Sequence, residues 1–137
     1  MLMKRFSAAA CAAVVAAASA TIANAHHSFS AEFDRNKPVN IEGTVVEFQW
    51  VNPHSWLIID AEKEDGTVEQ WAIEGGAPSA LLRRGWTRDT LPAGTRVKVS
   101  GFQAKDGALR ANANNIQFPD GTTLRIGSSG IGAAPAE

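Results

Sequence analysis

Hydrophobic and polar residues alternate along most of the chain from residue 39 onward, the pattern of strands with one buried face. Three Asp-Gly pairs, at 65–66, 106–107 and 120–121, interrupt the alternation, and such pairs are typical of tight hairpin turns. The pattern therefore predicts an all-β domain of mainly antiparallel strands. The expected strands are 39–50, 55–62, 67–74, 95–103, 109–118 and 122–126.

One segment, 78–84, is predicted to be a short helix. Pro78 suits the first turn, Leu81 and Leu82 supply apolar contacts, and Gly85 follows the last turn. The order is three strands, a helix, two strands and a terminal strand. This order resembles the OB-fold, a small five-stranded Greek-key barrel with a helix between strands 3 and 4. The extra C-terminal strand is expected to cover an edge of the sheet.

The long first strand changes its apolar phase near Gly43. Val39 and Ile41 share one parity, whereas Val46, Phe48 and Trp50 share the other. A glycine at a phase change indicates a bulge or a bend. We expect the strand to turn a corner of the barrel at Gly43.

Residues 1–25 have the pattern of a secretory signal peptide. Lys4 and Arg5 precede an Ala- and Val-rich segment, and Ala-Asn-Ala at 23–25 fits a cleavage site, with cleavage after Ala20 as the alternative. We therefore expect a periplasmic or secreted bacterial protein. Its expected parts are a polar lead-in at 26–38, the OB-like domain at 39–126 and a disordered tail at 127–137.

The expected mature chain is mildly acidic. Removing Lys4 and Arg5 from the 13 basic side chains leaves 11 against 14 acidic ones, a net charge of −3. Nucleic-acid binding depends on a basic face, so that class of function is excluded. The apolar run of the signal segment is too short for a membrane helix, and we expect no membrane span in the mature chain.

The three histidines, His26, His27 and His54, are the candidate metal ligands. If cleavage follows Ala25, His26 offers an α-amino and an imidazole nitrogen, and a second imidazole completes a set of three nitrogens suited to Cu(II) or another divalent transition metal. His54 follows Asn52-Pro53, a turn between two strands, so we expect it to be partly exposed near the lead-in. The alternative is a solvated histidine tail and a histidine that only stabilises its turn.

Aromatic and basic residues suggest two further sites. Trp50 and Trp56 flank His54, and with Asn52 they could bind a small ligand, a glycan or a partner protein without metal, although such aromatics commonly serve packing. Arg83, Arg84 and Arg88 surround Trp86 and form a weaker candidate for anion binding, with pairing to the helix C-terminus as the alternative.

Catalysis is the least favoured function. The carboxylates Glu47, Asp60 and Glu74 fall on strands, but no spacing fixes an acid–base pair, and no serine lies in a nucleophile motif. The sequence favours a binding protein over an enzyme.

Four motifs resemble those of a known group of proteins. They are H-H-S-F at 26–29, G-T-V-x-x-F-x-W-x-N-P-H-x-W at 43–56, S-A-L-L-R-R-G-W-T-R-D at 79–89 and P-A-G-T-R-V-K-V-S-G at 92–101. Together they are similar to an uncharacterised family of exported bacterial proteins that contain a domain of unknown function. The resemblance implies an exported β-barrel-like domain and carries no activity.

Overall fold

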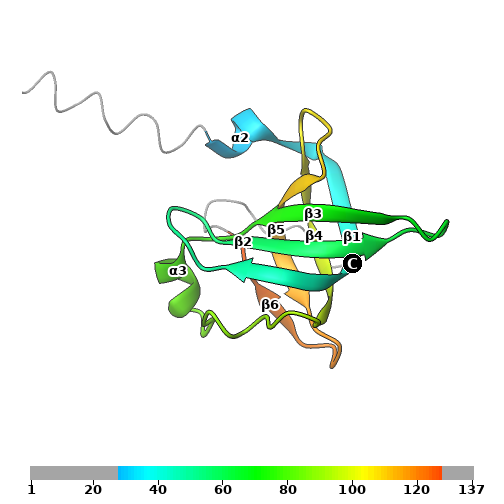
Figure 1. The fold of residues 1–137 in the computed structure, drawn as a ribbon. Helices are drawn as coiled ribbons and strands as arrows, with labels where there is room; N and C mark the ends of the chain where they lie inside the picture. The colour runs from blue at the N-terminus through cyan, green and yellow to red at the C-terminus, as the bar shows by residue number, and fades with distance from the viewer. Residues whose placement is uncertain (1–27, 128–137) are drawn as a thin grey trace, which may run out of the picture. The chain divides into compact units, whose positions relative to one another are not determined.

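The computed structural model describes residues 28–127 (Figure 1). The chain divides into two compact units after Ala31, and the unit that begins at Glu32 contains all six strands. A five-residue helix, α2 (Ser28–Glu32), crosses this division. The predicted signal peptide, His26, His27 and residues 128–137 of the predicted tail lie outside the described residues.

The prediction of an all-β fold is confirmed. Each predicted strand is found, with small changes at its ends except for the first strand, which begins six residues earlier than predicted. The only helix within the strand-bearing unit's described residues, apart from the end of α2, is the predicted one between the third and fourth strands. The elements are β1 (Phe33–Gln49), β2 (Trp56–Glu62), β3 (Val68–Glu74), α3 (Pro78–Leu82), β4 (Arg96–Ala104), β5 (Arg110–Gln117) and β6 (Thr123–Arg125).

The strands form one sheet that closes on itself. Their order is β3-β2-β1-β4-β5-β6, with antiparallel neighbours, and β3 additionally pairs with β5 in parallel (Figure 1). This extra pairing joins the two ends of a five-strand circuit, so the architecture is barrel-like as the OB-fold resemblance predicts. One consequence is that the end of β3 lies beside the start of β5.

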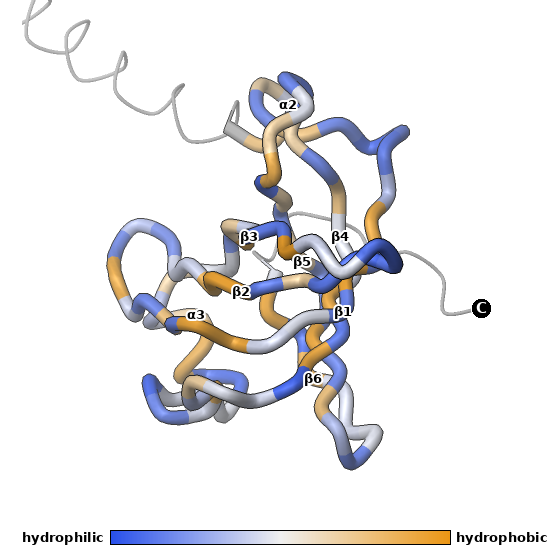
Figure 2. The backbone as a smooth tube through the Cα atoms, turned by 45° about the vertical axis from the view of Figure 1, so that its right-hand side comes forward, coloured by the Kyte–Doolittle hydropathy of each residue, from blue (hydrophilic) through white to orange (hydrophobic). Residues whose placement is uncertain are grey.

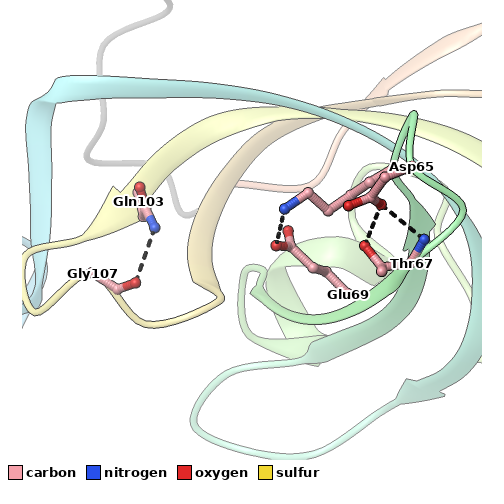
Figure 3. Close-up of polar contacts among 6 residues, drawn as sticks. Asp65, Thr67, Glu69, Gln103 and Gly107 are labelled. Carbon is pink, nitrogen blue, oxygen red and sulfur yellow. Dashed lines mark hydrogen bonds and ion pairs between the residues drawn. The ribbon is translucent and has the colours of Figure 1, made fainter.

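The Asp-Gly turns form as predicted. Gly66, Gly107 and Gly121 have φ values of 82°, 78° and 87°, which favour glycine. In the first turn, Asp65 accepts hydrogen bonds from the backbone and the hydroxyl of Thr67 (Figure 3), and these bonds lower the pKa of Asp65. Figure 3 also shows Gln103 donating to the Gly107 carbonyl beside the second turn.

β1 bends and changes partners in its middle. Thr44 is paired with β4 on one side and with β2 on the other. A Cβ atom at Gly43 would lie 2.7 Å from the Asp60 carbonyl oxygen, so glycine is needed for close approach of the backbones. The bulge itself is not at Gly43: the register shifts between Val45 and Glu47.

The start of β1 differs from the prediction. Residues 26–38 lack alternation and were expected to be a lead-in, yet β1 begins at Phe33, and α2 precedes it. Phe33 is buried and pairs with Ala104, and Lys105 donates a backbone hydrogen bond to Glu32. These contacts with β4 hold the segment extended where its own sequence gives no periodicity.

The core lies inside the closed sheet, where apolar positions alternate with polar ones along the strands (Figure 2). Trp86, next to α3, is buried and donates its indole N–H to the Arg125 carbonyl at 3.1 Å. Ile126, just after β6, is fully buried. β6 therefore covers an edge, and the residue that follows it, Ile126, completes the core. Within residues 28–127, no helix is long and apolar enough to cross a membrane.

Candidate functional site

The turn that carries His54 is fastened to the end of β3. The Ser55 backbone donates to the Gly76 carbonyl and accepts from the Gly75 N–H, while its hydroxyl also donates to Gly76. A Cβ atom at Gly75 would lie 2.6 Å from the Ser55 hydroxyl oxygen, so only glycine allows this approach. The neighbouring Asn52-Pro53 bond is cis. His54 is thus presented by an ordered corner.

His54 is oriented through one of its ring nitrogens. Its Nδ1 atom lies 3.3 Å from a carboxylate oxygen of Glu74 and 3.3 Å from the Gly75 carbonyl oxygen. The Gly75 carbonyl and an ionised Glu74 carboxylate can only accept hydrogen bonds, which favours the tautomer with the hydrogen on Nδ1. The side chain is 33% exposed, in agreement with the expected partial exposure. Among residues 28–127, the other nitrogen, Nε2, has no hydrogen-bond partner.

Glu74 is the last residue of β3 and lies on the outer face of the sheet. It is paired in register with Trp56 of β2 and with Asn112 of β5. Because Ile73 and Leu57, one position away, point into the core, Glu74 and Trp56 share the opposite face. Only 8% of Glu74 is exposed, so this carboxylate is buried although it lies on the outer face of the sheet.

The electrostatic environment of Glu74 disfavours its charge. Burial is the largest effect and raises the pKa of this carboxyl above its ordinary value. The charge of His54 lowers the pKa of Glu74, whereas the negative charge of Glu32 raises it further. The charge of Arg110 and hydrogen bonding by the Asn112 side chain also lower the pKa. Glu32 belongs to the predicted lead-in, so the residue just before β1 reaches the electrostatic neighbourhood of the His54–Glu74 pair.

Two side chains of β5, Asn112 and Arg110, contribute to the electrostatic environment of Glu74. Asn112 is 2% exposed, and Arg110 stacks over the Phe33 ring at 5.9 Å while approaching Asp106 at 3.8 Å. The Arg110 Nε atom and the Asn112 Oδ1 atom are buried without a hydrogen-bond partner among the described residues. Sequence reasoning missed Asn112 and Arg110, because only the parallel β3–β5 pairing brings them to Glu74.

The structure places the two tryptophans of the predicted aromatic site in different surroundings. Trp56 is half-buried on the outer face beside Glu74, and Asn52 is exposed at the corner. Trp50 instead packs against the core and makes an edge contact with Phe48, with ring centroids 5.6 Å apart. Of the two tryptophans, Trp56 is the one that shares a face with the His54–Glu74 pair.

The three arginines of the predicted anion site differ in their surroundings. Arg84 donates to the Gly127 carbonyl, so it helps to fasten the segment after β6. Arg83 and Arg88 are exposed. The structure therefore gives Arg84 a packing role and leaves the other two at the surface.

The predicted metal ligands are described only in part, because His26 and His27 lie outside the described residues. Among residues 28–127, no group of three or more His, Cys, Asp and Glu side chains is placed to hold a metal ion. The His54–Glu74 pair is also separate from a surface groove of about 490 Å³ on the other strands, lined in part by Asn40, Lys98, Ser100 and Asn115.

The fold and the site define a small barrel-like β domain that carries a histidine–carboxylate pair at an ordered surface corner. The chain belongs to the family of unknown function DUF6152, which matches residues 13–113. This finding confirms the resemblance to a domain of unknown function. No curated protein and no solved structure matches the chain.

Proposed function

We propose that the protein is an exported binding protein for a divalent transition metal, with Cu(II) as the preferred ion and His54 as a ligand. The observation that supports this most is the way His54 is held: an ordered corner fixes the ring through Nδ1, and one third of the side chain is exposed. Preorganised imidazole is a favourable ligand for copper and zinc because binding requires little further ordering.

The remaining nitrogens of the proposed site come from the start of the mature chain. Cleavage after Ala25 gives His26 a free α-amino group next to its imidazole, and His27 offers another imidazole. Both kinds of nitrogen lose protons to a metal near neutral pH. Three nitrogens in this set suit Cu(II), and export places the protein in the periplasm or outside the cell.

The first experiment determines the mature N-terminus. The protein is expressed with its native leader, collected after export and analysed by intact mass and N-terminal sequencing. We expect a chain that starts at His26. A chain that starts at Thr21 would remove the α-amino ligand from His26 and contradict this part of the proposal.

The second experiment tests the site itself. Cu(II) affinity is measured by competition titration for the mature protein, for His54→Ala and for His26→Ala, with Asn36→Ala as a surface control. We expect each histidine variant to bind at least about tenfold more weakly, and the control to be unchanged. Weak binding that is the same in wild type and His54→Ala would mean only adventitious affinity of the histidine-bearing tail.

A second candidate function is metal-free binding of a small ligand, a glycan or a partner protein around Trp56 and Asn52. The half-buried Trp56 on the outer face favours it, because an accessible indole can stack on a ligand. Tryptophan fluorescence is titrated with a panel of oligosaccharides and compared with Trp56→Ala. A response in metal-free protein that Trp56→Ala abolishes would support this function.

A further inference from the structure

We propose that Glu74 is a positioning residue that makes Nε2 of His54 the metal-binding atom, and that Asn112 holds Glu74 in place. This inference rests on the proposed metal function. It assigns roles to two residues outside the histidine set and states which of the two ring nitrogens binds. His54, Glu74 and Asn112 all lie within the strand-bearing unit.

The first step concerns the histidine ring. Nδ1 lies 3.3 Å from both the Glu74 carboxylate and the Gly75 carbonyl, and two acceptors facing one nitrogen favour a hydrogen on it. In neutral histidine the lone pair is then on Nε2. Turning the ring by half a revolution would place a carbon against both acceptors and lose the hydrogen bond. The ring is therefore held so that Nε2 is the nitrogen whose lone pair is available to bind a metal ion.

The second step concerns the carboxylate. Glu74 is 8% exposed, and its register partner Asn112 on β5 is 2% exposed. The Asn112 side chain is one of the groups that lower the pKa of the Glu74 carboxyl, so it lies where it can act on Glu74 as a hydrogen-bonding group. An ionised carboxylate only accepts, so the Asn112 amide donates through nitrogen. This leaves the Asn112 oxygen as the atom without a partner among the described residues, which agrees with the structure. Asn112 thus directs Glu74 toward His54.

The third step is the effect on metal binding. Histidines that bind metals commonly donate their other N–H to a carboxylate or a backbone carbonyl, which fixes the tautomer and makes the bound nitrogen more basic. His54 has both kinds of acceptor at once. Loss of such a partner lowers metal affinity by about 10- to 100-fold. Glu74 therefore acts through His54 and does not itself bind the ion.

The test combines metal-free and metal-bound measurements on the mature protein. Nitrogen NMR of uniformly labelled, metal-free protein reports the tautomer of neutral His54. Cu(II) titration and EPR report affinity and the atoms that bind. The variants are Glu74→Gln, which keeps the shape and removes the charge, and Asn112→Ala. Glu69→Gln is the matched control, since Glu69 is an ion-paired carboxylate on the same strand, 3.0 Å from Lys63.

In wild type we expect the Nδ1-protonated tautomer to dominate. Glu74→Gln should reduce its share and weaken Cu(II) binding about 10- to 100-fold, with the same number of bound nitrogens by EPR. Asn112→Ala should reduce the share of the Nδ1-protonated tautomer and the Cu(II) affinity by smaller amounts. Glu69→Gln should change neither the tautomer share nor the affinity. Circular dichroism verifies that each variant is folded.

Three results would overturn the inference: a dominant Nε2-protonated tautomer in wild type, unchanged affinity in Glu74→Gln, or loss of a carboxylate ligand from the EPR spectrum of that variant. Failure of the proposed function is a separate outcome. If wild type does not bind Cu(II) through His54, the metal proposal fails, while the tautomer in metal-free protein still tests the roles of Glu74 and Asn112.

Discussion

The carboxylate of Glu74 lies at a position where water solvates its charge poorly. Sequence inspection identifies it only as one of several acidic residues on strands. Its distinctive property, a raised pKa caused mainly by burial, arises because β2, β5 and Glu32 surround it. A side chain of ordinary type thus gains an unusual environment from neighbours that are distant in the sequence.

The raised pKa of Glu74 predicts a pH-dependent effect on stability. Because the folded-state pKa lies above the ordinary value of 4.5, the contribution of Glu74 is fully present below that value and is lost as pH rises through the folded-state pKa. The free energy of unfolding of Glu74→Gln minus that of wild type should therefore increase with pH. Urea unfolding of both proteins between pH 4 and 8 measures this difference.

The exposed carboxylate Glu62 provides the control for that experiment, since Glu62→Gln removes an acid at the surface. We expect its difference from wild type to vary little over the same range. A Glu74→Gln difference that is flat or decreases with pH would contradict the prediction.

At the scale of elements, the bulge in β1 separates two adjacent valines. Val45 is 2% exposed and lies in the core, whereas Val46, at the register shift, is 41% exposed. The change of apolar phase in the sequence predicts an irregularity in this strand. It does not determine the residue that bulges, because pairing with β2 decides the register.

The two valines give a matched pair of variants. Val45→Ala should lower the free energy of unfolding by about 2 kcal/mol, because it removes buried methyl groups and leaves a cavity. Val46→Ala should change it by less than about 0.5 kcal/mol, since the side chain is largely in solvent. Chemical denaturation of both variants checks the result. Equal losses would mean that the bulge is placed elsewhere in solution.

The contact between β4 and β5 depends on Gly101. A Cβ atom there would lie 2.2 Å from the Asn112 carbonyl oxygen and 2.9 Å from the Ala113 Cα atom, both in the backbone of β5. Backbone atoms cannot move aside as a flexible side chain can. The same strand carries Asn112, so a displaced β5 would also disturb the surroundings of Glu74.

We expect Gly101→Ala to destabilise the fold by about 3 kcal/mol through this overlap. Gly107→Ala is the comparison, because a Cβ atom there would meet open space. Only the φ of 78° disfavours alanine, and we expect a loss of about 1 kcal/mol in the free energy of unfolding. Thermal and urea unfolding measure both. A smaller loss for Gly101→Ala than for Gly107→Ala would contradict the close approach of the two strands.

At the scale of the whole strand-bearing unit, the C-terminal strand closes the core. Ile126 is fully buried, its carbonyl accepts from the Gly76 N–H, and the Asn114 carbonyl accepts from Ile126. Trp86 donates a hydrogen bond to the Arg125 carbonyl, and Arg84 donates one to the Gly127 carbonyl. The family match ends at residue 113, yet the residues after it complete the packing.

Ile126→Ala should therefore lower the free energy of unfolding by about 3 kcal/mol, the range for truncation of a fully buried aliphatic side chain. Thr123→Ala, an exposed substitution on β6, should change it by less than about 0.5 kcal/mol. Denaturant titrations with two optical probes measure both and test for two-state unfolding. If Ile126→Ala were as mild as the control, the C-terminal strand would be an appendage only.

The amino-acid sequence by itself determined the local features of this protein. The alternation of apolar residues predicts the strands, the Asp-Gly pairs predict the turns, and proline and glycine limit the helix, because these signals depend on neighbouring residues. The corner at Asn52-Pro53-His54 is local in the same sense. The prediction that His54 is partly exposed followed from this turn.

Only the tertiary structure decided what surrounds that histidine. The parallel β3–β5 pairing, the strand start at Phe33 and the placement of Glu74 between His54 and Asn112 join residues far apart in the chain. Such long-range pairs are selected by closure of the sheet and burial of its core, and no local pattern records them. The sequence thus indicated the histidine, and the closed sheet supplied the carboxylate that orients it.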